Sequence, residues 1–164
     1  MIKFSKNLLL NPARIQVSGI KCNFNNIVKL LDVLNCNWIV VTIDSVTEKS
    51  SLLTLIKDNG LKYFVKPCSS EYVEISALIP YDFFEDFLHK AINEDPENIF
   101  VFNLLDPANS TMCLQHSYEE LVTTGIVDVF ISISLDENAL LVYMNKSLIS
   151  PRNVYTRIKA LHLD

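Results

Sequence analysis

The sequence predicts a single α/β domain over residues 1–164, with a mixed sheet that is parallel in its first half and antiparallel in its second. Through residue 66, strand-like and helix-like segments alternate as β-α-β-α-β, an order typical of parallel strands joined by helical crossovers. Near the carboxyl end, two strand-like segments flank a short turn, which predicts an antiparallel hairpin. The 164 residues, 49% of them hydrophobic, suffice for one domain with its own core.

The first half owes its predicted elements to hydrophobic periodicity. Residues 14–20 alternate polar and apolar side chains, and residues 38–43 form a continuous β-branched run of the kind found in fully buried strands. Ser45 and Glu48 have the spacing of a capping box that opens a helix ended by Gly60. We therefore expect strands at 14–20, 38–43 and 61–65, and helices at 24–34 and from Ser45 to Gly60.

The second half has clearer helix start signals. Ser117 and Glu120 form a capping box before a short helix closed by Gly125, and Ser150 precedes a proline that suits the first helical position. Residues 136–138 form the turn of the predicted hairpin. We expect strands at 72–79, 99–105, 129–133 and 140–144, and helices at 81–93, after Ser117 and from Pro151.

Charge is strongly segregated along the chain. Residues 1–66 hold nine basic and four acidic side chains, whereas residues 67–150 hold two basic and fourteen acidic ones, a net charge of −12. The last fourteen residues are again basic, with a net charge of +2. A large field of one sign steers partners of the opposite sign, so the acidic block predicts a basic protein partner and disfavours nucleic acid.

The predicted helix at 81–93 indicates how that acid is displayed. At about 100° per residue, one side of this helix carries Asp82, Glu85, Asp86 and His89. The opposite side carries the apolar residues Phe83, Phe84, Phe87, Leu88 and Ala91, together requiring burial. Acids in a first helical turn also complement the helix dipole, which is the simpler interpretation. The predicted partner-binding residues are Asp82, Glu85, Asp86, Glu94, Asp95 and Glu97.

The sequence contains no recognisable catalytic, nucleotide-binding or metal-binding motif. Cys113 and His116 have the spacing of half a metal site or of a Cys–His pair, but further ligands are missing nearby in the sequence. We therefore expect no metal and no cofactor. The four cysteines form no C-x-x-C pair, so we expect reduced thiols that pack as small hydrophobic groups.

These observations favour a cytoplasmic, non-enzymatic protein-binding inhibitor, of the bacterial immunity-protein or antitoxin kind, whose acidic surface neutralises a basic nuclease-like toxin. One alternative is a structural or adaptor subunit of a larger assembly. Another is a small-molecule-binding domain with a site near Asp44 and Cys68, at the carboxyl ends of parallel strands. The apolar run at residues 8–10 is too short for a signal peptide, and we expect no membrane association. Oligomeric state and the partner's identity do not follow from the sequence.

Overall fold

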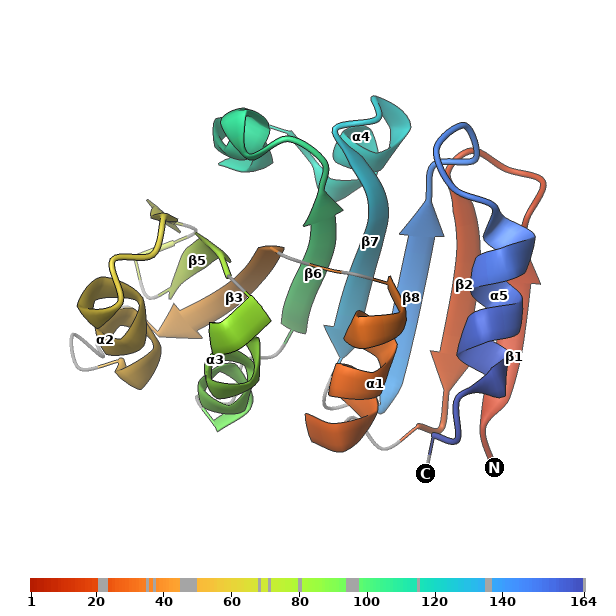
Figure 1. Cartoon of the computed structure of the whole chain (residues 1–164), viewed down its shortest axis with the longest axis horizontal. Helices are drawn as coiled ribbons and strands as arrows, with labels where there is room; N and C mark the ends of the chain where they lie inside the picture. The colour runs from red at the N-terminus through yellow and green to blue at the C-terminus, as the bar shows by residue number, and fades with distance from the viewer. Residues whose placement is uncertain are drawn as a thin grey trace.

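The computed structural model is built around one eight-stranded sheet with the strand order β1-β2-β8-β7-β6-β3-β5-β4 (Figure 1). It describes residues 1–20, 24–34, 36, 38–44, 50–67, 69–70, 72–79, 81–93, 98–114, 116–134 and 137–163. The strands are β1 (Lys3–Asn7), β2 (Ala13–Ser18), β3 (Trp38–Asp44), β4 (Tyr63–Pro67), β5 (Tyr72–Leu78), β6 (Asn98–Leu104), β7 (Val127–Ser134) and β8 (Ala139–Met144). The helices are α1 (Phe24–Leu34), α2 (Ser51–Asp58), α3 (Tyr81–Asn93), the 3₁₀ helix η1 (Pro107–Leu114), α4 (Tyr118–Thr123) and α5 (Pro151–Ala160).

The prediction of a parallel β-α-β-α-β first half is wrong. Every strand pair in the described part of the sheet is antiparallel. The three strands expected to pair, β2, β3 and β4, do run in one direction, as helical crossovers require. However, β8, β7 and β6 lie between β2 and β3, and β5 lies between β3 and β4. The helical crossovers determine the direction of β2, β3 and β4, and strands from later in the chain lie between them as antiparallel neighbours.

One strand and the start of one helix also differ from expectation. Strand β1 was not predicted, because an edge strand needs little apolar surface: four of its five side chains are exposed. Helix α2 begins at Ser51, and its N-cap is Ser50, whose hydroxyl accepts a hydrogen bond from the Leu53 amide at 3.2 Å. The helix start expected at Ser45 lies outside the described residues.

The start signals of the second half are confirmed. The Ser117 hydroxyl accepts from the Glu120 amide, and the Glu120 carboxylate accepts from the Ser117 amide at 2.8 Å, which completes the capping box. Ser150 caps α5, and Pro151 occupies its first turn. Strands β7 and β8 form the predicted hairpin, in which Asn138 adopts the left-handed conformation with φ of 49°.

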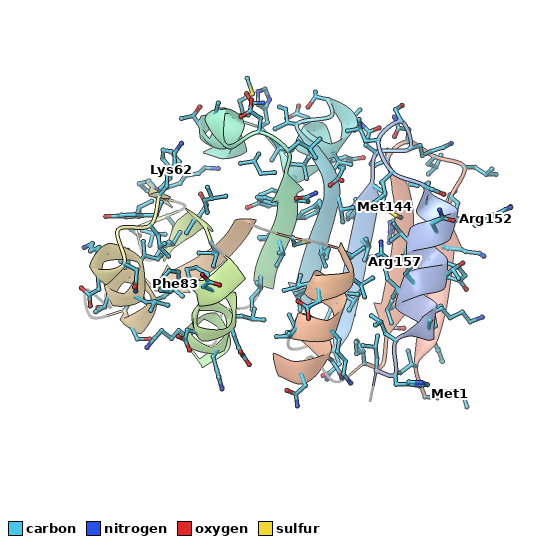
Figure 2. All side chains as sticks on the ribbon, in the orientation of Figure 1. Met1, Lys62, Phe83, Met144, Arg152 and Arg157 are labelled. Atoms are coloured by element: carbon cyan, nitrogen blue, oxygen red, sulfur yellow. The ribbon has the colours of Figure 1, made fainter. Side chains whose placement is uncertain are left out.

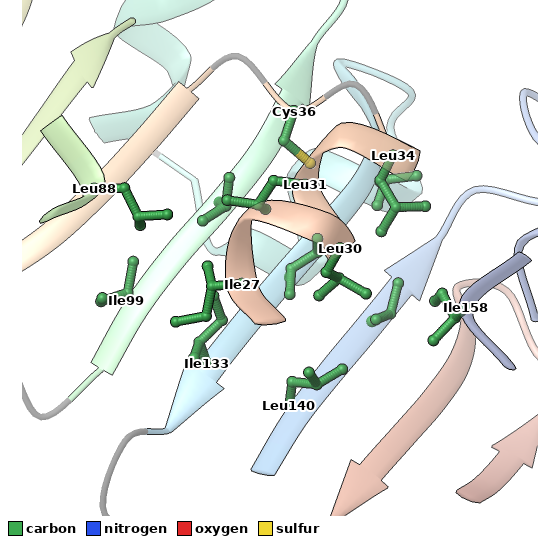
Figure 3. Close-up of a cluster of buried hydrophobic side chains, with 14 of the residues drawn as sticks. Ile27, Leu30, Leu31, Leu34, Cys36, Leu88, Ile99, Ile133, Leu140 and Ile158 are labelled. Atoms are coloured by element: carbon green, nitrogen blue, oxygen red, sulfur yellow. The ribbon is translucent and has the colours of Figure 1, made fainter. Parts of the chain in front are cut away.

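Helices α1, α2, α3 and α5 cover one face of the sheet and bury the main core (Figure 1). Figure 3 shows the centre of this layer, where Ile27, Leu30 and Leu31 of α1 meet Ile99 and Ile133 of the sheet. A smaller aromatic cluster lies on the other face, under α4. There the ring of Tyr118 lies 4.5 Å from that of Phe100 and 5.1 Å from that of Phe130, measured between centroids.

Within the described ranges, none of the helices combines the length and the apolar character needed to cross a bilayer.

Candidate protein-binding surface

Helix α3 has the two faces that its sequence predicts. Phe87 and Leu88 are fully buried against the main core, whereas Asp82, Glu85 and Asp86 are exposed to solvent. The segregation follows from the helical period, since the residues that must leave water all lie on the side facing the sheet. Three of the predicted partner-binding residues therefore share one accessible helix face. The other three, Glu94, Asp95 and Glu97, lie outside the described residues.

Asp82, Glu85 and Asp86 form no ion pair within the described part of the chain, although His89 and Lys90 follow them on the same helix. The neighbouring Lys90 points instead into an open hollow of about 390 Å³ between α2 and α3. That hollow is lined by Ser51, Thr54, Leu55, Asp58, Asn59 and Lys90. Its lining contains one acid, Asp58, and one base, Lys90.

The region around Asp44 is built from antiparallel strands, and not from the directly paired parallel strands that we expected beside a small-molecule site. Asp44 ends β3 and is paired with Tyr72, the first residue of β5. Strands β3 and β4 run in the same direction on either side of β5, so their carboxyl ends, Asp44 and Pro67, lie at the same edge of the sheet with the first residues of β5 between them. Cys68 and the side chain of Asp44 lie outside the described residues.

The Cys113 and His116 pair is only partly described, because the Cys113 side chain is outside the described set. The imidazole Nδ1 of His116 lies 3.7 Å from the Glu120 carboxylate, which also caps α4. Hydrogen bonds from Ser117 are the main cause that lowers the pKa of Glu120, with a smaller contribution from His116. His116 therefore supports a helix end, and the described residues contain no group of three potential metal ligands.

A half-buried polar pair that the sequence did not reveal, Asn103 and Asp128, lies at the start of β7. Asn103 donates a hydrogen bond of 3.3 Å to Asp128, and burial raises the pKa of the Asp128 carboxyl. Burial also raises the pKa of the nearby Cys36 thiol, and Asp128 raises it further. A buried, protonated thiol is a poor nucleophile, so these residues have the character of packing rather than of a reaction centre.

The opposite end of the sheet is strongly basic. Residues 1–20 and 137–163 form β1, β2, β8 and α5, which lie side by side at one end of the strand order. These two segments contain a single acid, Glu137, and seven basic residues: Lys3, Lys6, Arg14, Lys146, Arg152, Arg157 and Lys159. Figure 2 shows Arg152 and Arg157 on α5, far from α3, which bears Phe83. The basic residues of these two segments therefore lie far from α3, whereas Lys57 on α2 and Lys66 on β4 lie at the same end of the sheet as α3.

No protein-family model matches this chain, and a search of curated proteins finds no relative.

Proposed function

We propose that this protein is a non-enzymatic inhibitor that binds a basic protein through the acidic face of α3. The observation that carries the proposal is the exposure of Asp82, Glu85 and Asp86 on one helix face, where none of them forms an ion pair in the described structure. Unpaired surface charges of one sign accelerate association with an oppositely charged partner and disfavour partners of like charge. An immunity protein that neutralises a basic nuclease-like toxin needs this property and no catalytic site.

The position of the acidic face supports the same proposal. The buried side of α3 is anchored by Phe87 and Leu88, so the carboxylates project from a rigid element of the fold. A rigid acidic helix face presents its charges without the entropic cost of ordering a loop. The basic end formed by β1, β2, β8 and α5 lies at the other end of the strand order, so the cations nearest to the acidic face are closer ones such as Lys57 of α2 and Lys90 of α3.

The test compares two charge-reversed variants of equal net charge. One carries Asp82→Lys, Glu85→Lys and Asp86→Lys on α3. The matched control carries Asp32→Lys, Glu119→Lys and Glu137→Lys, which replace three exposed acids on other elements. Each tagged protein is used to capture basic proteins from an extract of the source cells at low salt, and the captured protein is then purified.

Association rates of the purified partner are measured at several ionic strengths by surface plasmon resonance. We expect the α3 variant to associate at least about tenfold more slowly at low salt, with a weaker salt dependence, because steering by α3 is lost. The control should change the rate far less. Equal slowing by both variants would assign the effect to net charge, and an unchanged rate in the α3 variant would refute the proposed surface.

A further inference from the structure

Apolar side chains are concentrated at one end of the sheet, on the loops that we call the rim: residues 8–12, 105–126 and 145–150 (Figure 1, upper edge). Seven large hydrophobic residues are exposed in the described part of the chain, and five of them lie on the rim: Leu9, Leu10, Leu105, Met112 and Leu148. Leu9 is 88% exposed and Leu10 57%. Such a concentration of exposed apolar surface on a small domain is typical of an interaction site.

Hydrogen bonds join the three loops of the rim into one surface. The Lys146 ammonium donates to the Leu9 carbonyl at 2.8 Å, which ties loop 145–150 to the tip of the β1–β2 hairpin. The neighbouring Asn145 amide donates to the Val122 carbonyl at 2.7 Å and so ties the same loop to the end of α4. Loop 145–150, which carries Leu148, therefore lies between the other two.

The two halves of the rim carry opposite charges. Basic residues surround the β1–β2 hairpin and the start of α5: Lys6, Arg14, Lys146 and Arg152. Acidic residues accompany η1 and α4: Asp106, Glu119 and Glu120. Between residues 98 and 134 the chain contains no lysine or arginine, so the acidic half has no compensating cation of its own. The rim is thus an apolar row that is basic at one end and acidic at the other.

We propose that the rim binds a second copy of this chain in a two-fold symmetric dimer. A two-fold axis through the middle of the rim, near Leu148, places the basic half of each copy opposite the acidic half of the other. It also buries the exposed leucines of both copies together. Complementary charges at both ends of an apolar contact then fix its register.

The same features disfavour a bilayer or a uniformly charged partner on the rim, and they also disfavour a dimer formed by pairing of edge strands. An anionic bilayer would attract the basic half but repel Asp106, Glu119 and Glu120. A uniformly acidic or basic partner would meet one half of like charge. Direct pairing of edge strand β1 with another strand is opposed by its lysines, Lys3 and Lys6, which are typical of edges protected against such pairing.

The experiment uses complementary variants of the full chain, analysed by sedimentation equilibrium over a wide concentration range. The acid-making variant carries Arg14→Glu and Arg152→Glu. The base-making variant carries Glu119→Lys with Asp106→Asn and Glu120→Gln, because Asn and Gln retain the capping bonds of those two residues. The two variants differ from the wild type by charge changes of −4 and +4. Lys6 and Lys146 are left unchanged because they contact Tyr155 and Leu9.

We expect the wild type to dimerise and each variant alone to dimerise at least about tenfold more weakly, because like charges then face each other. An equimolar mixture of the two should form a heterodimer at low salt. A third variant, Leu9→Ser with Leu148→Ser, should be monomeric, whereas Val65→Ser, which removes an exposed apolar side chain elsewhere, should dimerise like the wild type.

Three results would overturn the proposal. One is a wild-type protein that stays monomeric at all concentrations, and another is a dimer that the rim variants leave unchanged. The third is a monomer that sediments with phosphatidylserine vesicles in a Leu9-dependent manner, which would make the bilayer the occupant. Circular dichroism of each variant confirms that it is folded. The dimer is independent of the proposed α3 surface, so either proposal can fail alone.

Discussion

Asn145 offers the sharpest test of how this fold is held together, because its side chain joins two parts of the rim. It is 5% exposed, and its amide nitrogen donates to the Val122 carbonyl at 2.7 Å and to the Thr123 carbonyl at 3.4 Å. Its amide oxygen accepts from the Ser147 amide at 2.9 Å. A neutral hydrogen bond contributes about 1 kcal/mol net, and the long bond to Thr123 contributes less. The Asn145→Ala variant should therefore lose about 2 kcal/mol of unfolding free energy.

The Asn145→Asp variant makes the reasoning more specific. It keeps the oxygen that accepts from Ser147 but replaces the donor with a second oxygen, which then faces the Val122 carbonyl. We expect it to be less stable than Asn145→Ala at neutral pH, because a buried carboxylate then lies against carbonyl oxygens.

Urea-induced unfolding measures both losses as shifts of the midpoint at constant slope. The control is Asn153→Ala on the exposed side of α5, for which we expect a change within about 0.5 kcal/mol. A loss below about 0.5 kcal/mol for Asn145→Ala, or an Asp variant as stable as the Ala variant, would refute the account.

Three further predictions concern the core, a cap and a half-buried acid. Leu30→Ala should lower the unfolding free energy by about 2–5 kcal/mol, because Leu30 is fully buried. Leu9→Ala should change it by less than about 0.5 kcal/mol in the monomer, because Leu9 is exposed. Equal losses of unfolding free energy for the two variants in urea titrations would contradict this packing. Ser117→Ala should cost about 1 kcal/mol at neutral pH. Because the pKa of Glu120 is lowered, the stability that this capping box contributes is fully present above the ordinary glutamate pKa. It is lost as the pH falls through the lowered pKa of the folded state, so the difference in unfolding free energy between the wild type and Ser117→Ala should shrink in acid. Asp128 has a pH dependence of the opposite sign. Its raised pKa means that the folded state binds a proton more tightly than the unfolded state, so the unfolding free energy falls as the pH rises through the folded-state pKa. Asp128→Asn should therefore be more stable than the wild type at pH 7 but not below the carboxyl pKa, and a stability difference that stays constant across pH would contradict burial as the cause.

Much of the local structure was predictable because its causes are local. The capping box at Ser117, the N-cap at Ser150 and the two faces of α3 depend on residues within a few positions of one another. For the same reason, the exposure of Asp82, Glu85 and Asp86 followed from helical periodicity. The partner that meets these carboxylates stays a prediction.

Strand pairing was not predictable in the same way. The β-branched run of β3 predicted a strand buried on both faces, and the structure places β3 inside the sheet, between β5 and β6. The two-residue alternation of side chains does not distinguish parallel from antiparallel neighbours, because side chains alternate between the faces of the sheet in either case. The helical crossovers suggested parallel pairs, but a crossover fixes only the direction in which the chain returns.

The sequence by itself therefore determined most of the helices and strands, but neither β1 nor η1, together with the buried side of α3 and the division of the charge into blocks. Only the tertiary structure decided which strands are neighbours, that both basic segments meet at one end of the sheet, and that Leu9, Leu105 and Leu148 share one rim. The physical reason is the separation along the chain of the residues that interact. Periodicity and caps act over a few residues, whereas sheet order and surface patches depend on contacts between residues far apart in the chain, which no local pattern records.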